Sequence, residues 1–204
     1  MTLKAILFDL YGTLLFLKSN RRPYLQLCKT LRVSDRLRES LLVDAHSLLD
    51  FCTHLDLAPP PGLSMLQQIL EEDLHSATLY SESLSTLESL KVRGYRLGLI
   101  SNLASPYKQP FYRLGLEEYF SEILFSCEIG MAKPNPQVYR LALQKLHLAP
   151  EEALMVGDRQ RPDVIAPREL GMQSLWLNRQ GEPSQKGHIQ SLSEVEEWVL
   201  REDF

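Results

Sequence analysis

Long apolar runs, a stripe of basic residues and paired cysteines are all missing from this chain of 204 residues. No apolar segment approaches the roughly 20 residues that cross a bilayer, and no signal peptide is recognisable, so we expect no membrane partner. A net charge of -4 without a basic stripe argues against a nucleic-acid partner. Three cysteines without a CxxC pair favour reduced thiols and a cytoplasmic location.

Histidine also lacks the spacing of a metal site. The five histidines form neither an HxxxH nor an HExxH pattern, so we assign none of them to a metal. What the chain does have is apolar residues, which make up 44% of it and suffice for a sizeable core. Length and composition together predict one domain of ordinary size with a modest insertion.

Five short apolar runs are typical of buried strands and are separated by helical or loop segments. They cover residues 5–8, 96–100, 122–125, 153–156 and 174–177. Strands that alternate with helices predict an α/β fold, a doubly wound parallel sheet covered on both faces in the manner of a Rossmann fold. We expect a final helix over 193–200, capped by its serine, to close this core.

Residues 17–78 break this alternation because they show helical periodicity and no convincing strand. The sequence therefore predicts a small helical cap domain over 17–78, inserted into a core made of 1–16 and 79–204. Helices are expected to start near Asn20 and near Ser34, and the prolines of segment 59–62 must interrupt the helices around them.

Polar groups lie at or beyond the ends of four of the predicted strands. They are Asp9, then Ser101 with Asn102, then Lys133, and then the Gly157–Asp158 pair. Each alone is an ordinary strand end or helix cap, but ligands of open parallel sheets bind at the carboxyl ends of the strands. A carboxylate, a hydroxyl, an ammonium and a second acid at one edge are the groups that phosphoryl transfer needs.

Four segments resemble, in order, the motifs of the haloacid dehalogenase-like hydrolases: FDLYGTL at 8–14, ISN at 100–102, KP at 133–134 and VGD at 156–158 with Asp163. Many members of that family carry a helical cap after the first motif. The resemblance implies that Asp9 is a nucleophile and that Ser101 and Lys133 hold the transferring group. It further implies that Asp158 and Asp163 serve a metal.

The implied ligands suit Mg²⁺, which prefers an all-oxygen site. Asp9, the backbone carbonyl of Tyr11 and Asp158 would supply the oxygens, with Asp163 acting directly or through water. Thr13, Ser101 and the backbone amides of the turn would bind phosphoryl oxygens. On the same grounds Tyr11, Gly12 and Asn102 are expected to border the substrate.

Tyr11 departs from the family's phosphatases, which usually carry a second aspartate at this position as the general acid. Losing such an acid typically costs about 10²–10⁴ in rate, and a phenol with an ordinary pKa of about 10 is a poor substitute. Tyr11 either faces the substrate or fills space between core and cap. The motif DLYGT is instead similar to that of the haloacid dehalogenases proper.

The fourth motif favours a phosphatase, because the dehalogenase branch has serine and asparagine where this chain has Gly157 and Asp158. Two neighbouring carboxylates repel each other, so retaining Asp158 beside Asp9 makes sense chiefly with a cation between them. The leading hypothesis is a Mg²⁺-dependent phosphatase acting on a small phosphorylated metabolite through an aspartyl-phosphate. The alternatives are a metal-independent 2-haloacid dehalogenase and a phosphate-ligand-binding protein with weak catalysis.

Four arginines near these segments have two interpretations. Arg159 and Arg161 after the fourth motif, and Arg21 and Arg22 at the start of the insertion, either contact an anion of the substrate or lie in solvent. The usual surface preference of arginine favours solvent. The sequence specifies neither the substrate nor the oligomeric state.

Overall fold

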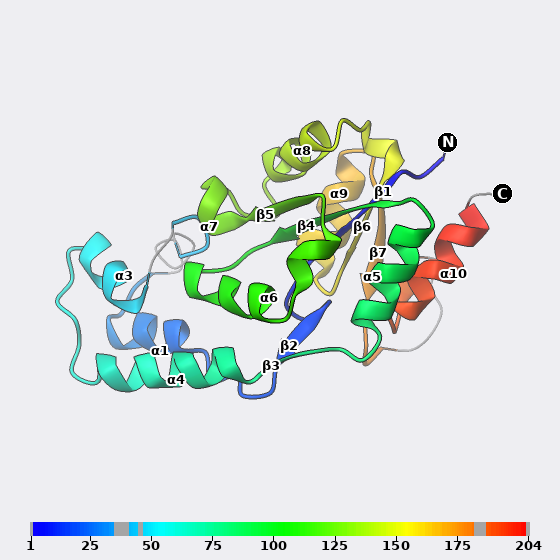
Figure 1. Ribbon diagram of the computed structural model, residues 1–204. Helices are drawn as coiled ribbons and strands as arrows, with labels where there is room; N and C mark the ends of the chain where they lie inside the picture. The colour runs from blue at the N-terminus through cyan, green and yellow to red at the C-terminus, as the bar shows by residue number, and fades with distance from the viewer. Residues whose placement is uncertain (1, 35–40, 45–46, 182–186, 203–204) are drawn as a thin grey trace.

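The computed structural model describes residues 2–34, 41–44, 47–181 and 187–202. Its centre is a six-stranded sheet in which every pairing is parallel, in the order β5-β4-β1-β6-β7-β8 (Figure 1). These strands are β5 (Glu122–Phe125), β4 (Arg96–Ser101), β1 (Ala5–Phe8), β6 (Ala153–Gly157), β7 (Gln173–Leu177) and β8 (His188–Ile189). The five predicted strands are confirmed; β8 has two residues, too few for a pattern to be recognised from sequence.

Helices cover both faces of the sheet, as the alternating pattern predicts. One face packs against α5 (Ser83–Val92), α6 (Gln109–Arg113) and α10 (Ser193–Glu202), and the other against α8 (Pro136–Lys145) and α9 (Ala166–Glu169). Strand β1 serves both layers, because Ile6 and Phe8 belong to the first core cluster and Ala5 and Leu7 to the second. The sheet is thus buried on both sides, which explains the continuous apolar runs.

Shorter elements connect these layers. They are α7 (Ser126–Ile129) and the single turns η1 (Ser105–Lys108), η2 (Leu116–Tyr119), η3 (Pro150–Glu152) and η4 (Gln160–Ile165). None of the helices among the described residues is both long and apolar enough to span a bilayer.

A cluster of helices extends from the carboxyl edge of the sheet. It comprises α1 (Pro23–Thr30), α3 (Leu48–His54) and α4 (Leu63–His75), which gather at the left of Figure 1. The three helices share an apolar cluster of their own, and Ala104 and Tyr107 of the core pack against it. We call this cluster the helical insertion.

A small antiparallel ribbon joins the helical insertion to the core. Strand β2 (Leu15–Leu17) pairs with β3 (Ala77–Leu79), with Leu15 opposite Leu79 and Leu17 opposite Ala77. The sequence did not predict these strands, because three residues are too few to display an alternating pattern. The ribbon lies at both ends of the predicted cap, so chain entry and exit are adjacent.

Local starts and stops in the helical insertion differ in part from expectation. A helix does start near Asn20, but Asn20 is not its cap, because α1 begins at Pro23 and follows Arg22, whose backbone is left-handed (φ 56°) and whose side chain caps nothing. The helix expected after Ser34 falls on 35–40, outside the described residues. Residues 41–44 form a turn, so the periodicity there belongs to more than one element.

Other boundaries follow recognisable chemistry. Ser47 and Asp50 form a capping box that starts α3, and the prolines of segment 59–62 separate α3 from α4 as predicted. Helix α10 begins at Ser193, also as predicted. Its cap differs, however, because the Ser193 amide donates to the hydroxyl of Ser191, and Glu194 accepts the Ser191 amide.

Candidate active site

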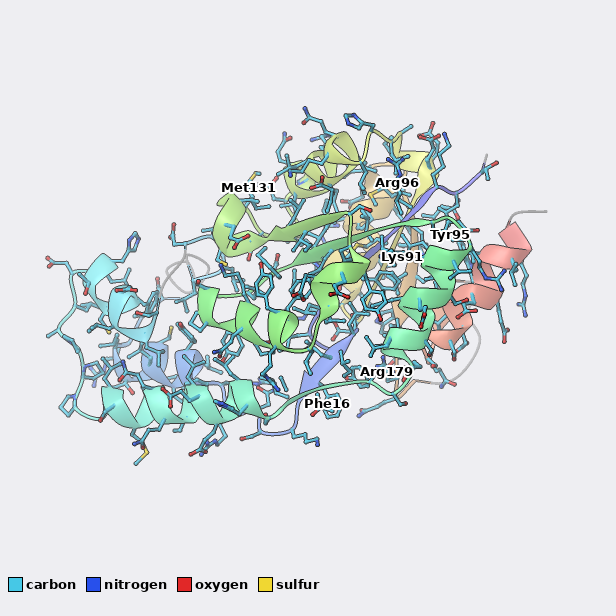
Figure 2. All side chains as sticks on the ribbon, in the orientation of Figure 1. Phe16, Lys91, Tyr95, Arg96, Met131 and Arg179 are labelled. Carbon is cyan, nitrogen blue, oxygen red and sulfur yellow. The ribbon has the colours of Figure 1, made fainter. Side chains whose placement is uncertain are left out.

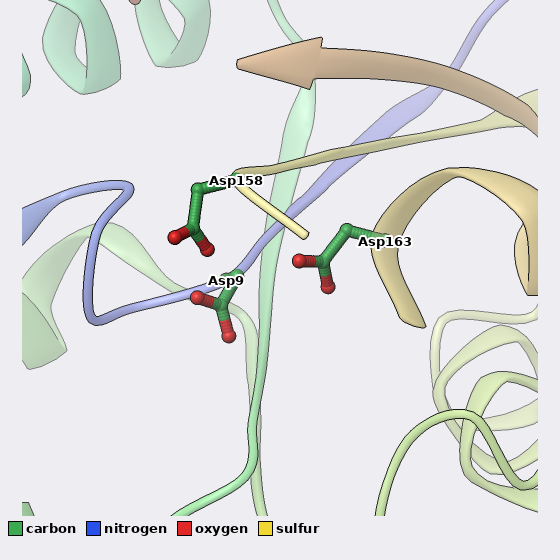
Figure 3. Close-up of side chains that lie close together, drawn as sticks. All are labelled: Asp9, Asp158 and Asp163. Atoms are coloured by element: carbon green, nitrogen blue, oxygen red, sulfur yellow. The ribbon is translucent and has the colours of Figure 1, made fainter. Parts of the chain in front are cut away.

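Three carboxylates meet at the carboxyl edge of the sheet. Asp9 follows β1, Asp158 follows β6, and Asp163 lies in the turn η4, and an oxygen of each lies within 4.8 Å of the others (Figure 3). Strands β1 and β6 are direct neighbours, with Phe8 opposite Val156. The parallel register therefore brings Asp9 and Asp158 together at the point where both strands end.

Lys133 bridges two of these acids. Its Nζ donates to Asp9 Oδ1 at 2.8 Å and to Asp163 Oδ1 at 2.6 Å, and the side chain is almost fully buried. Burial alone would lower the pKa of this lysine, but the two carboxylates more than offset it and the pKa is raised. Lys133 is therefore an ammonium, fixed between Asp9 and Asp163.

Asp163 uses both of its oxygens inside the protein. Besides Lys133 it accepts the backbone N–H of Arg159 at 3.0 Å on Oδ2. The close fit requires a glycine at position 157, where a Cβ would lie 2.4 Å from the Asp163 carboxyl carbon. Burial, opposed by Lys133, raises the pKa of Asp163 to about 6. These contacts let Asp163 hold Lys133 in place.

Asp158 has one carboxylate oxygen without a hydrogen-bond partner among the described residues. Its Oδ1 is buried and accepts no hydrogen bond from any described residue. Burial and the charge of Asp9 raise the pKa of Asp158. Its backbone carbonyl accepts the indole N–H of Trp176 on the neighbouring strand β7. A buried carboxylate oxygen without a donor is rare in folded proteins and marks a place for a cation or a proton donor.

The turn after Asp9 presses against Asp158. Gly12 has φ 88°, and a Cβ there would lie 2.4 Å from Asp158 Oδ2, so only glycine fits. Its N–H donates to the Leu15 carbonyl at 2.8 Å, and the Thr13 N–H donates to the Leu10 carbonyl. These two amides are therefore engaged within the turn. The predicted contact of turn amides with phosphoryl oxygens remains a prediction.

The hydroxyl of Thr13, by contrast, is buried and has no hydrogen-bond partner among the described residues. Ser101 lies buried at the end of β4 on the same edge of the sheet. The two hydroxyls are at the positions where the sequence predicts contacts with phosphoryl oxygens. That role remains a prediction.

Asn102 serves the lysine segment. Its amide accepts the Lys133 N–H at 2.8 Å and donates to the Lys133 carbonyl at 2.6 Å. Both ends of the amide are thus occupied by the backbone that carries Lys133. Asn102 also lines the cavity described below, so its predicted contact with substrate remains open to test.

Tyr11 points its phenol away from the acids. The hydroxyl donates to the Tyr107 carbonyl at 2.9 Å, and the two rings meet edge to face with centroids 5.8 Å apart. Burial raises the pKa of Tyr11 far above its ordinary value. The hydroxyl is therefore bound within the core, to a residue that itself packs against the helical insertion. Tyr11 also lines the cavity described below, so both interpretations that the sequence allowed stay predictions. The metal-binding role expected of its carbonyl remains a prediction.

Arg179, which follows β7, supports the turn from the other side (Figure 2 labels it beside Phe16). Its guanidinium donates to the Thr13 carbonyl at 2.9 Å, pairs with Glu82 at 2.6 Å and lies 3.4 Å over the ring of Tyr80. Nothing in the sequence predicted this role for Arg179. The only signal there was an arginine just past a predicted strand, which is too common to decide anything.

A cavity of about 650 Å³ opens beside Asp158, between core and helical insertion. Arg22 and Arg159 line it, whereas Arg21 and Arg161 do not. The remaining lining residues are Tyr11, Gly12, Phe16, Leu17, Asn20, Tyr24, Leu25, Leu41, Leu42, Tyr80, Asn102, Leu103, Ala104, Tyr107 and Asp158. A volume of this size matches the sites that hold small-molecule ligands.

The chain is similar to proteins of known sequence and structure. A glyceraldehyde 3-phosphate phosphatase from Methanothermobacter thermautotrophicus is 32% identical over 133 residues, which are 64% of this chain and 59% of that protein. The chain therefore spans less than two thirds of that relative's length. The crystal structure of a HAD phosphatase from Thermococcus onnurineus is 27% identical and has a TM-score of 0.70, covering 97% of this chain and 98% of that chain.

A 2-haloacid dehalogenase from Pseudomonas syringae pv. Tomato DC3000 has the same fold, with a TM-score of 0.73 over 100% of both chains at 22% identity. Residues 3–171 match the family model of the haloacid dehalogenase-like hydrolases, and this range contains all four motifs and the three acids. The chain belongs to the haloacid dehalogenase-like hydrolases.

Proposed function

We propose that this protein is a Mg²⁺-dependent phosphatase that acts in the cytoplasm on a small phosphorylated metabolite. The observation that carries the proposal is the unpartnered, buried Oδ1 of Asp158 inside a cluster of three carboxylates and one ammonium. The phosphatases named above, among relatives and structures, point the same way.

The residues present fit Mg²⁺. Three carboxylates against one ammonium leave excess negative charge in a buried site, which would repel an anionic substrate. Asp9 and Asp158 would hold the cation together with the Tyr11 carbonyl, and Asp163 would act through water because Lys133 and Arg159 occupy its oxygens. The bound cation would neutralise charge on the carboxylates and on the phosphoryl oxygens.

The reaction we propose has two steps at Asp9. A carboxylate oxygen of Asp9 attacks phosphorus, the P–O bond to the leaving group breaks, and an aspartyl-phosphate forms; water then attacks phosphorus, releasing phosphate and restoring the carboxylate. Lys133 holds Asp9 Oδ1 and adds positive charge beside the reacting centre. The hydroxyls of Thr13 and Ser101 would bind phosphoryl oxygens.

The helical insertion supports this assignment as a cap. We propose the division made from sequence, with the cap over 17–78 and the core formed by 1–16 and 79–204. The chain enters and leaves the insertion through the narrow β2–β3 ribbon, and the cavity lies where cap and core face each other. Residues from both parts would then contact a bound substrate and exclude water.

Replacing the nucleophile tests the proposal. Asp9→Asn should abolish Mg²⁺-dependent hydrolysis of p-nitrophenyl phosphate while leaving the circular dichroism spectrum unchanged. Asp56→Asn is the matched control, because it removes a carboxylate from an exposed loop residue after α3. Full activity in the Asp9 variant, or wild-type activity that survives EDTA, would remove the proposal.

A 2-haloacid dehalogenase remains the second candidate because of Tyr11. The phenol of Tyr11 donates to the Tyr107 carbonyl, whereas an acid that protonates a leaving group would have to face the substrate. Displacing halide from carbon needs no such acid. Release of chloride from 2-chloropropionate in the presence of EDTA would favour this candidate. Tight phosphate binding without turnover of any phosphoester would instead favour a phosphate-binding protein.

A further inference from the structure

Two arginines from different parts of the chain line the same cavity. Arg22 comes from the start of the helical insertion, and Arg159 follows the acid Asp158 in the core. Both side chains are exposed, and neither forms an ion pair within the part of the chain that the structure describes. The charge of Arg159 acts on Asp158 and opposes the rise in the pKa of that acid, but no described carboxylate lies within ion-pair distance of either guanidinium, so their donors are available to a ligand in the cavity.

The neighbouring arginines behave differently. Arg21 pairs with Glu72 and lies 3.9 Å from a carboxylate oxygen of Asp73, and Arg161 pairs with Glu169 at 2.7 Å. Neither of these arginines lines the cavity. In each of the two turns, one arginine forms an ion pair at the surface. The other arginine lines the cavity and forms no ion pair with a described residue.

The backbone at Arg22 is held in an unusual conformation. Its left-handed φ of 56° costs a residue with a side chain about 1–2 kcal/mol. The fully buried carboxylate of Asp73, on α4, accepts the backbone N–H groups of Arg21 at 3.0 Å and Arg22 at 3.2 Å and so fixes this turn. Asp73 is a positioning residue that presents Arg22 at the cavity.

Arg159 is anchored in a similar way. Its N–H donates to Asp163, so the side chain starts directly beside the acid cluster. Asp158 is the only described acid that lines the cavity, and apart from the two arginines the other lining residues are apolar or uncharged, among them Leu25 and Leu103. The described lining of the cavity thus has two cationic side chains against one carboxylate.

We propose that the cavity binds phosphoesters that carry a second anionic group, which Arg22 and Arg159 hold while the phosphoester meets Asp9. This inference rests on the proposed phosphatase function and specifies its substrate class. A carboxylate or a second phosphate would satisfy the two guanidinium groups, because the oxygens of either anion match the planar fork of arginine donors. Substrates with neutral tails would leave both arginines unpaired.

Three substrates on one scaffold test the inference. Glycerol 3-phosphate has a neutral tail, 3-phosphoglycerate replaces the terminal hydroxymethyl group by a carboxylate, and glycerol 1,3-bisphosphate adds a second phosphate. All three present an alkoxide leaving group, so differences among them report on the tail. We expect kcat/KM to be at least about tenfold higher for an anionic tail, mostly through KM. The larger value between the two anionic substrates identifies the preferred group.

Charge-removing variants assign the effect to the two arginines. In Arg22→Gln and in Arg159→Gln, the ratio of kcat/KM for the preferred anionic substrate to that for glycerol 3-phosphate should fall about tenfold. The matched controls Arg21→Gln and Arg161→Gln remove the same charge one or two residues away and should leave the ratio unchanged. Arg22→Lys should restore part of the loss, since it keeps the charge but not the fork.

The outcomes separate this inference from the proposed function. Equal kcat/KM for the three substrates, in an enzyme that hydrolyses p-nitrophenyl phosphate with Mg²⁺, overturns the inference alone. The inference also fails if the Arg21 and Arg161 controls lower the ratio as much as the Arg22 and Arg159 variants. Absence of Mg²⁺-dependent hydrolysis of every phosphoester overturns the proposed function and the inference together.

Discussion

The phenol of Tyr11 is tied to the backbone carbonyl of Tyr107, 2.9 Å from its oxygen, at the junction of core and helical insertion. The group that replaces the aspartate of related phosphatases is thereby occupied, buried and held protonated by its raised pKa. It is a poor proton donor for an alkoxide leaving group. The position of Tyr11 should therefore limit which leaving groups the enzyme can release.

We predict a strong preference for leaving groups that need no proton. The kcat for p-nitrophenyl phosphate should exceed that for glycerol 3-phosphate by about 10²–10⁴, the usual contribution of a general acid. Tyr11→Asp should narrow this gap by restoring a carboxyl group, whereas Tyr11→Phe should leave it unchanged. Steady-state kinetics of the three proteins on both substrates check this, and a gap that changes in Tyr11→Phe would show that the phenol takes part in the proton transfer.

Gly12 allows a prediction with a close internal control. Gly12→Ala places a Cβ 2.4 Å from Asp158 Oδ2 and should displace that carboxylate, lowering kcat/KM by at least about 10². Gly94 has nearly the same φ, 91° against 88°, but open space around its Cβ position. Gly94→Ala should thus lose about 1–2 kcal/mol of stability, as expected for left-handed backbone, without losing activity.

Urea unfolding and p-nitrophenyl phosphate kinetics on both variants separate strain from displacement. If Gly94→Ala reduced activity as much as Gly12→Ala, backbone strain alone would explain the loss. If neither did, the contact between the turn and Asp158 would have no part in catalysis.

The sheet and the acid cluster were predictable from sequence because their signals are local. Apolar runs mark strands β1, β4, β5, β6 and β7, and parallel strands bring Asp9 and Asp158 to one edge wherever they occur. The residues Asn102 and Tyr11 line the cavity, their predicted contact with substrate stays a prediction, and their hydrogen-bond partners were not foreseen. Both bond to backbone atoms far along the chain, which no pattern in their own segments encodes.

The helical insertion was less predictable for the same reason. Arg21 and Arg22 carry the same side chain, yet only Arg22 lines the cavity, in a turn whose backbone is held by the buried Asp73 about fifty residues later. Asn20 has the character of a helix cap, yet the Asp73 carboxylate takes over the first free amides of that turn. Long-range hydrogen bonds to backbone override the local capping preference here.

Binding of the proposed cation should stabilise the folded protein, because the unpartnered oxygen of Asp158 would then coordinate the cation. Adding Mg²⁺ at ten times its dissociation constant should stabilise the wild-type protein by about 1.4 kcal/mol and raise Tm by roughly 3–5 °C. Asp158→Asn should abolish this shift. Without Mg²⁺ the variant should be at least as stable as wild type, because it removes a buried charge beside Asp9.

Thermal denaturation in EDTA and in Mg²⁺ measures both effects, with Asp56→Asn as the variant that keeps the shift. A Mg²⁺-dependent rise in Tm that persisted in Asp158→Asn would place the cation elsewhere. If Asp158→Asn in EDTA were much less stable than wild type in EDTA, Asp158 would have a structural role instead.

Asp163 predicts a pH dependence of stability in the metal-free protein. Burial raises its pKa from 3.8 to about 6, so the folded state binds a proton more tightly than the unfolded state. Its stabilising contribution is therefore present below about pH 4 and is lost as the pH rises through 6. A shift of this size corresponds to a loss on the order of 1–3 kcal/mol.

Because other carboxylates titrate in the same range, the comparison with Asp163→Asn isolates this contribution. In EDTA, we subtract the unfolding free energy of Asp163→Asn from that of wild type, and this difference should decrease between about pH 4 and pH 6.5. The corresponding difference between wild type and Asp56→Asn should vary little over the same range. Mg²⁺ should weaken the trend, since a nearby cation favours the ionised carboxylate. A difference that increased with pH would mean that Lys133 outweighs burial and holds Asp163 ionised throughout.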